Sequence, residues 1–139
     1  MIREGSIHLP FAYAAGPAAS RFLVSLRDEG RILGSPCPAC RRVLCPARSF
    51  CPRCGDETGE PISVGPAGTV VSFTAQAGGV VFGLVRLDGA DTAMLHRLLG
   101  DGMRWTIGAR VRPRLAARRQ ASITDIEGFE PLQEPGDGT

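Results

Sequence analysis

Lysine is missing from this chain of 139 residues, and aromatic residues make up only 6% of it. All 16 positively charged side chains are arginine, and 14 acidic residues leave a formal net charge of +2. A protein of this size dedicated to nucleic acid usually carries a much larger positive excess. The charge balance therefore argues against nucleic acid as the main partner.

Long apolar runs are also missing. None approaches the length of about 20 residues that spans a bilayer. Nothing like a signal peptide opens the chain, because Met1-Ile2-Arg3-Glu4 leads into polar, proline-rich sequence. We therefore expect a cytoplasmic protein with no membrane partner, in which cysteines stay reduced.

Motifs for catalysis are absent as well. His8 lies in a loosely patterned N-terminal segment, and His96 lies inside a predicted strand without a nearby carboxylate in sequence. No serine stands in a G-x-S-x-G motif, and no glycine pattern matches a dinucleotide or P-loop fingerprint. Asp88 and Asp91 flank a predicted turn rather than forming an acid/base pair. The sequence predicts a binding or scaffolding protein, not an enzyme.

What the chain does have is two C-x-x-C pairs separated by ten residues: Cys37, Cys40, Cys51 and Cys54. Two residues between cysteines let both sulfurs face one point from a tight turn. Two such turns form a tetrahedral cage of four thiolates, which suits zinc and leaves no position for a catalytic water. We expect structural Zn²⁺, with iron in a rubredoxin-like cage as the alternative.

The segment around these cysteines has few side chains to bury, namely Val43, Leu44 and Phe50. Such a small core cannot stabilise a fold, and structural zinc supplies on the order of 10–16 kcal/mol in isolated fingers. We interpret residues 35–60 as a zinc ribbon. Cys45 fits neither pair and is expected to be a small, half-buried side chain. Four arginines beside the cage are expected to compensate its negative charge: Arg41, Arg42, Arg48 and Arg53.

Before the ribbon, residues 1–34 are predicted to form an arm and a helix. Proline suits the first helical position, so Gly16-Pro17 marks a start, and Gly30 is a suitable stop. Between Ala18 and Glu29 the apolar residues fall on one stripe. A helix of about three turns is not stable alone, so it must pack on this protein or on a partner.

A connector rich in glycine and proline follows at 59–68. After it, apolar residues recur at every second position instead of at helical spacing. This pattern predicts five strands, at 69–75, 80–87, 93–99, 108–115 and 123–129. Short strands with glycine turns and little helix favour a closed barrel of the OB-fold type over residues 61–131. Residues 132–139 are predicted to be a disordered tail. The fold class is thus mainly β: helix, zinc ribbon, then a five-stranded barrel.

Arginines alternate along the fourth predicted strand, at Arg110, Arg112 and Arg114, and so project from one face. Such a stripe suits the phosphate groups of a nucleotide-like ligand, or an acidic partner surface. The alternative is a solvated edge strand that charge and proline protect from aggregation.

Several segments together resemble one known family, the proteins with a rubredoxin-like zinc ribbon and an OB-fold that are described as acyl-CoA-associated. The similar segments are R-F-L-V-S-L-R-D-E-G-R-I-L-G, C-P-A-C, P-A-R-S-F-C-P-R-C-G, G-T-V-V-S-F-T and I-G-A-R-V-R-P. The family usually has a second proline where Ala47 stands, and an aromatic or aliphatic residue where Cys45 stands. Neither departure affects a cysteine of the two pairs.

The resemblance implies a non-catalytic accessory subunit that binds a thiolase-superfamily enzyme, such as a lipid-transfer-type thiolase or aldolase or an acetyl-CoA acetyltransferase. A hydratase-like subunit is a further partner in this family. The implied role is to help bind or channel acyl-CoA substrates in lipid or sterol metabolism. We expect four apolar residues of the arm and helix to contact the partner: Phe11, Tyr13, Phe22 and Leu23.

The alternative function is nucleic-acid binding, because zinc ribbons and OB-folds both serve that purpose. It requires stacking aromatics beside a basic groove. The aromatics on or near the predicted strands are Phe73, Phe82 and Trp105, and most of them fit core positions equally well. A free-standing acyl-CoA carrier or hydrolase is a third class, but it lacks a visible nucleophile.

Overall fold

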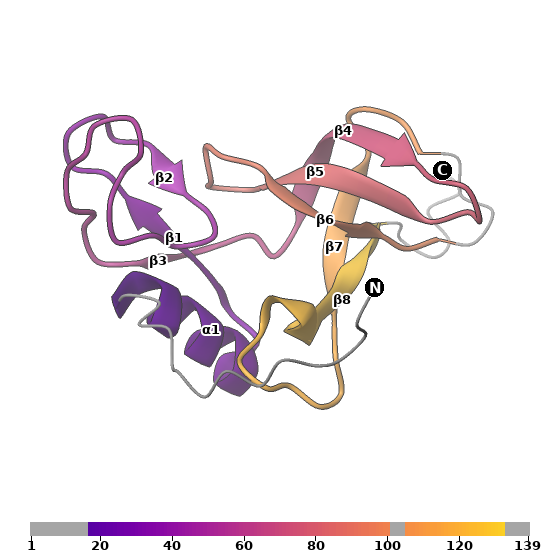
Figure 1. The fold of residues 1–139 in the computed structure, drawn as a ribbon, viewed down its shortest axis with the longest axis horizontal. Coiled ribbons are helices and arrows are strands. Elements are labelled where there is room, and N and C mark those ends of the chain that lie inside the picture. Colours follow the sequence, from indigo (N-terminus) through magenta and orange to yellow (C-terminus); the bar gives the residue numbers. More distant parts are fainter. Residues whose placement is uncertain (1–16, 101–104, 133–139) are drawn as a thin grey trace, which may run out of the picture.

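The computed structural model describes residues 17–100 and 105–132. These residues form a helix, a small three-stranded sheet and a closed five-stranded barrel (Figure 1). In chain order the elements are α1 Pro17–Glu29, β1 Ile32–Pro36, β2 Val43–Leu44, β3 Ile62–Val64, β4 Gly68–Ala75, β5 Val81–Leu87, β6 Met94–Leu98, β7 Arg110–Leu115, the 3-10 helix η1 Ile123–Asp125, and β8 Ile126–Pro131. The mainly β fold predicted from the sequence is confirmed. The predicted tail lies almost entirely outside the described residues.

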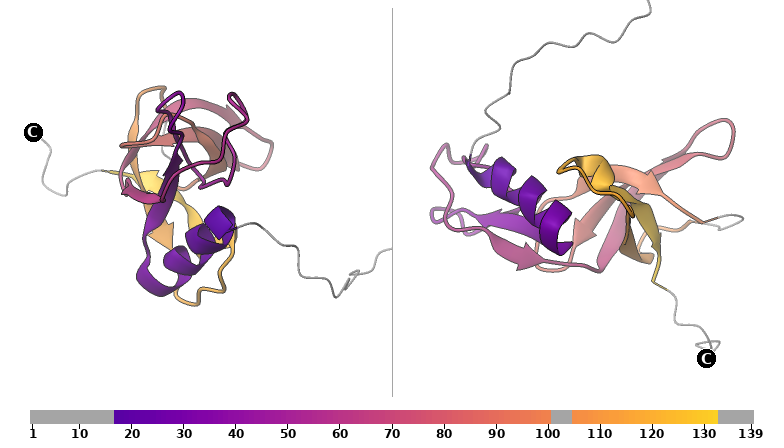
Figure 2. Two further views of the ribbon diagram at one scale, coloured as in Figure 1. Left: turned by 90° about the vertical axis from the view of Figure 1, so that its left-hand side faces the viewer. Right: turned by 90° about the horizontal axis from the view of Figure 1, so that it is seen from below.

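Helix α1 runs from Pro17 to Glu29, as its proline start and glycine stop predict. Its buried side chains are Ala18, Phe22 and Leu26, spaced four residues apart on one face. That face packs against β1, and the helix also contacts η1 (Figure 2). The helix is therefore stabilised by this chain's own core. No helix among the described residues has the length and apolar character that a membrane crossing requires.

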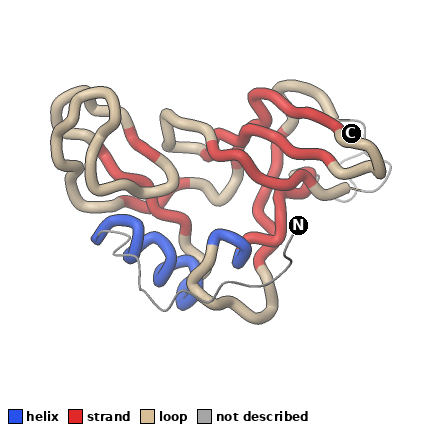
Figure 3. Tube along the Cα trace, viewed as in Figure 1, coloured by secondary structure: helices blue, strands red, loops and turns tan. Residues whose placement is uncertain are grey.

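The ribbon part is built on β1, which pairs with β2 along one edge and with β3 along the other. Most of this part is loop, with short strands between long turns (Figure 3). Strand β3 falls in the segment that the sequence indicated as a connector and as the start of the barrel. Because Val64 pairs with Ile32, β3 belongs to the ribbon sheet. A strand of only three residues, flanked by proline and glycine, is too short for its alternation of side chains to be recognised in the sequence.

The barrel closes in the order β4-β5-β6-β8-β7, and β7 pairs back onto β4. All neighbours are antiparallel except β6 and β8, which pair in parallel at Leu98 and Phe129. This topology confirms the five-stranded OB-type barrel. Strand β7 has a hydrogen-bonded neighbour on each side, so the interpretation of its arginines as an edge-strand device is wrong.

The fifth predicted strand starts later than expected. Residues Ile123–Asp125 form η1, and β8 begins only at Ile126. Asp125 is 2% exposed, and its carboxylate accepts hydrogen bonds from the backbone N–H groups of Gln120, Ala121 and Ser122. Burial by itself raises the pKa of Asp125, but these three donors outweigh it and hold the pKa below its ordinary value. A local hydrogen-bond network therefore replaces the strand that alternation predicted.

The ribbon is attached to the barrel through the turn after β5. Asp91 accepts a hydrogen bond at 2.8 Å from the backbone N–H of Val43, and the Asp91 N–H donates to the Val43 carbonyl at 2.8 Å. The Thr92 hydroxyl accepts from the Cys45 N–H and donates to the Cys45 carbonyl. These bonds hold the end of β2 against the barrel, so the two parts share one core at this point.

Candidate metal centre

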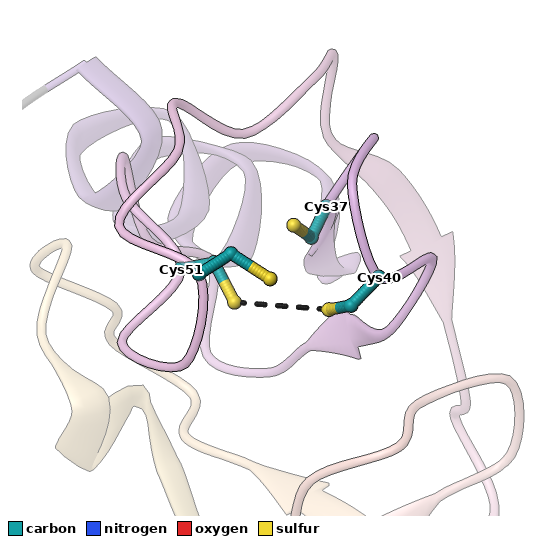
Figure 4. A group of neighbouring side chains, drawn as sticks. Cys37, Cys40 and Cys51 are labelled. Carbon is teal, nitrogen blue, oxygen red and sulfur yellow. Dashed lines mark hydrogen bonds between the residues drawn. The ribbon is translucent and has the colours of Figure 1, made fainter.

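The four paired cysteines, Cys37, Cys40, Cys51 and Cys54, meet at one point. Their sulfur atoms all lie within 4.8 Å of one another. The sulfurs of Cys40 and Cys51, which come from different loops, are 3.9 Å apart (Figure 4). Sulfurs bound tetrahedrally at about 2.3 Å from zinc would be about 3.8 Å apart. The donor set and its spacing therefore fit a structural zinc ion.

The two loops that carry these cysteines have the same backbone geometry. In the first, Cys37 N–H donates to the Arg42 carbonyl and Arg41 N–H donates to the Cys37 carbonyl. In the second, Cys51 bonds in the same way to Asp56 and Gly55. The fifth residue of each loop has a left-handed backbone, with φ 64° at Arg41 and 75° at Gly55. The loops are thus two copies of one knuckle.

Backbone donors also prepare one of these sulfurs, that of Cys51, for a cation. The N–H groups of Cys54 and Arg53 point at the Cys51 sulfur and lower the pKa of its thiol to about 7, although burial opposes this. A thiolate is the form that binds metal, so a lowered pKa favours the bound state. When bound, zinc would crosslink the two knuckles. Four arginines near the cage, Arg41, Arg42, Arg48 and Arg53, form no ion pair with a described acidic residue.

The ribbon's own core is smaller than the sequence suggested. Leu44 is buried between Cys37 and Cys51, but Phe50 is 61% exposed and Val43 is only half-buried. Phe50 instead lines an open cavity of about 420 Å³ between the start of α1 and the second knuckle. The expectation that Phe50 is a core residue is wrong. Because fewer apolar side chains are buried around the cysteines than expected, the stability of this part depends even more on the metal.

Cys45 is more deeply buried than expected, at 4% exposure, and it belongs to the main core rather than to the cage. Burial raises the pKa of its thiol to about 12. A thiol that stays protonated is neither a metal ligand nor a nucleophile. His96 is equally engaged, since its Nδ1 accepts from the Arg97 N–H at 2.8 Å and its Nε2 lies 3.3 Å from the Ile123 carbonyl. Burial lowers the pKa of His96.

The arginine stripe projects outward from β7, as alternation predicts. Each of its members has an acidic partner within the fold: Arg110 bonds to Asp88, Arg112 to Glu130 and Arg114 to Glu127. These guanidinium groups are occupied by carboxylates of the same chain. Phosphate binding at this stripe would have to displace them.

Of the four residues expected to contact a partner, the structure describes only Phe22 and Leu23. Phe11 and Tyr13 lie outside the described residues. Phe22 is 2% exposed and packs in the main core, while Leu23 is half-buried against it. Phe22 is thus part of this chain's own core and is not available to a partner, a correction that follows from the packing of α1 on β1.

Sequence reasoning missed the residues that join ribbon to barrel, Asp91 and Thr92. Their partners, Val43 and Cys45, lie more than 40 positions away in the chain. No local pattern marks such a contact. The equivalence of the knuckles, in contrast, is visible in the sequence, because both cysteine pairs have the form C-P-x-C.

Fold and site together define a class: a protein with a structural tetracysteine zinc ribbon joined to an OB-type barrel. Residues 25–58 match the family model described as the ChsH2 rubredoxin-like zinc ribbon domain. The matched segment contains all four cysteines of the cage. The segment that holds the cage is therefore similar to a rubredoxin-like zinc ribbon of that description.

Two solved structures are similar over most of the chain. A DUF35-family protein of unknown function from Sulfolobus solfataricus is 26% identical, with a TM-score of 0.60, over 73% of this chain and 80% of that one. An Ltp2–ChsH2(DUF35) aldolase is 20% identical, with a TM-score of 0.58, over 88% of this chain and 100% of the matched one. No curated protein matches the sequence. The second similarity supports the fold alone.

Proposed function

We propose that this protein is a non-catalytic zinc-binding accessory subunit of a thiolase-superfamily enzyme. The partner is a lipid-transfer-type thiolase or aldolase, or an acetyl-CoA acetyltransferase, and a hydratase-like subunit is a third member of the proposed complex. The observation that carries this proposal is the combination of a ChsH2-type ribbon with a barrel that has the fold of a chain from an Ltp2–ChsH2 aldolase.

The chemistry of the described residues supports an accessory role. Four cysteines are committed to a closed cage, and Cys45 is a buried thiol whose pKa is raised to about 12. His96 has both ring nitrogens within hydrogen-bond distance of backbone groups, so it is not poised to move a proton to or from a substrate. The proposed partner supplies the nucleophile and the acid/base groups. This protein helps to bind or channel the acyl-CoA substrate of a lipid or sterol pathway.

Nucleic-acid binding is less well supported. Trp105 is 7% exposed and belongs to the main core, so it is not available to stack on bases. The arginines of β7 are paired with acids. Among the described strand aromatics Phe73, at 38% exposure, is the most exposed, and no free basic stripe lies beside it on β7.

Coexpression with the thiolase-superfamily subunit encoded nearest to it tests the proposal. We expect the two chains to elute together in size-exclusion chromatography with stoichiometric zinc. Titration calorimetry should show tighter binding of a CoA thioester to the complex than to this chain alone. A chain that stays apart from that subunit, or that hydrolyses a thioester unaided, would contradict the proposal. Salt-dependent binding of a single-stranded oligonucleotide would support the alternative.

A further inference from the structure

The barrel has two outer faces of different character. On β7 and β8 the outward arginines are neutralised: Arg112 lies 3.0 Å from Glu130, its register partner, and Arg114 lies 3.1 Å from Glu127. On β4, β5 and β6 no residue is acidic. Figure 1 shows β4, β5 and β6 as neighbours running across the view, while β7 and β8 run steeply past them. The charge pattern thus divides the barrel into a self-paired face and an unpaired one.

The unpaired face has an apolar centre. Leu84 on β5 lies opposite Leu95 on β6, and both side chains point outward, with 38% and 66% of their surface exposed. Phe82, the next outward residue on β5, is half-buried beside them. Scattered exposed leucines are normal on a protein surface, but adjacent ones on neighbouring strands form a patch, and patches mark interaction sites.

An arginine borders this apolar centre on each side along the strands. Arg97 lies opposite Phe82, and Arg86 is the next outward residue after Leu84. Both arginines are exposed, and neither forms an ion pair with any acidic residue in the described part of the chain. We call the surface of Phe82, Leu84, Arg86, Leu95 and Arg97 the β5–β6 face.

Its position in the fold is that of a binding face. Strands β5 and β6 are the second and third strands of the barrel, and OB-folds bind their ligands on the face of these two strands. Single-stranded nucleic acid needs aromatic side chains for stacking, but this centre is aliphatic, with one half-buried phenylalanine. An apolar centre with arginine at its rim is instead the composition of a protein–protein interface.

A second copy of the chain does not suit the β5–β6 face. In a symmetric dimer the same patch meets itself, so Arg86 and Arg97 would face arginines across the interface. Strands β4, β5 and β6 carry no carboxylate and neither arginine forms an ion pair with a described acidic residue, so like charges brought together across such an interface would oppose association. The charges require a partner that supplies acidic groups.

We propose that the β5–β6 face is the surface that binds the thiolase-like partner subunit. The partner's contact surface has an apolar centre, which covers Leu84 and Leu95, and carboxylates that pair with Arg86 and Arg97. This inference rests on the proposed function and deepens it by assigning the interface. It assigns the contact to β5 and β6 instead of to Phe22, Leu23 and the arginines of β7.

The test measures binding of the same thiolase-superfamily subunit to wild type and to four variants by surface plasmon resonance. Leu95→Glu and Arg97→Glu change the β5–β6 face. Ile62→Glu, on β3 of the ribbon sheet with 44% exposure, is the matched apolar control. Arg118→Glu, an exposed arginine without an ion pair among the described residues, is the matched charge control. Zinc content and the thermal midpoint are measured for every variant, so that a failure to fold is recognised.

We expect Leu95→Glu and Arg97→Glu each to weaken binding about tenfold or more, as truncation at an interface centre does, and both controls to bind like wild type. Normal binding by both face variants would overturn this inference but leave the proposed function standing. A loss shared by the controls would also overturn it. Wild type that fails to bind at all would refute the proposed function, and this inference with it. Self-association or oligonucleotide binding that Leu95→Glu abolishes would reassign the face.

Discussion

The ribbon and the barrel are held together by different means. The barrel, α1 and the strands β1 and β3 share one continuous hydrophobic core that includes Leu26, Ile32 and Phe129, all nearly inaccessible to solvent. The cysteine loops of the ribbon have a separate cluster that consists of Leu44 and the buried cysteines Cys37 and Cys51. Two of the three buried residues in the ribbon cluster are thus proposed metal ligands. The difference shows that one chain can combine a fold stabilised by solvent exclusion with a fold stabilised by coordination.

The consequence is that the two parts should respond to different perturbations. Removal of metal should affect the ribbon first, because little apolar surface remains to hold it. Removal of core volume should affect the barrel first. The junction at Asp91 and Thr92 decides how far each effect spreads.

Metal removal should have the largest effect. Chelation, or the double variant Cys37→Ser/Cys51→Ser, removes a contribution of about 10–16 kcal/mol in zinc-finger peptides, so the ribbon should lose its structure. Hydrogen exchange should show lost protection in the two cysteine loops and β2, and persistent protection in β5 and β6. Elemental analysis of wild type should give one metal ion per chain.

Cys45→Ala is the matched control for metal removal. Cys45 is a buried cysteine outside the cage, so its replacement should leave the metal content unchanged and cost only local packing. Loss of metal in this variant would show that the cage has been assigned to the wrong cysteines. Full protection of the ribbon without metal would show that its core is sufficient.

Phe129→Ala should have the next largest effect. Phe129 is 0% exposed and stacks edge-on against His96, with ring centroids 5.6 Å apart. A truncation of this kind costs about 3–5 kcal/mol of unfolding free energy. Denaturant titration should show the loss, whereas zinc content at low denaturant should remain at wild-type level. Phe50→Ala, at an exposed phenylalanine, should change stability by no more than about 0.5 kcal/mol.

Much of this fold was predictable because its signals are local. Proline and glycine marked the ends of α1, alternation marked the barrel strands, and cysteine spacing identified the metal centre. The failures share a cause. Strand β3, the engagement of the β7 arginines by Asp88, Glu127 and Glu130, and the burial of Phe22 all depend on contacts between distant segments. Alternation says which way Arg112 points, but not that a carboxylate from β8 will meet it.

Asp91→Ala tests the junction and should have a moderate effect. It removes the acceptor for the Val43 N–H, a bond worth about 1 kcal/mol at a site that water can reach. We expect faster exchange of the Val43 amide and a small decrease in unfolding free energy. Asp91→Asn retains a carbonyl acceptor and should lie between wild type and Asp91→Ala. Equal behaviour of all three proteins would show that the backbone bond from Asp91 N–H suffices to hold β2.

The smallest effects concern the left-handed residues of the two knuckles. One of the two changes, Arg41→Gly, is expected to stabilise the protein, unlike the changes above. Arg41 occupies a left-handed conformation that Gly55 occupies in the second knuckle. Side chains other than glycine are strained there by about 1–2 kcal/mol, which the greater freedom of glycine in the unfolded chain partly offsets. Arg41→Gly should therefore raise the thermal midpoint slightly, and Gly55→Ala should lower it by a similar amount. Chelator competition should rank zinc affinity in the same order. If Arg41→Gly instead weakens zinc binding, the charge of Arg41 beside the thiolates outweighs its backbone strain.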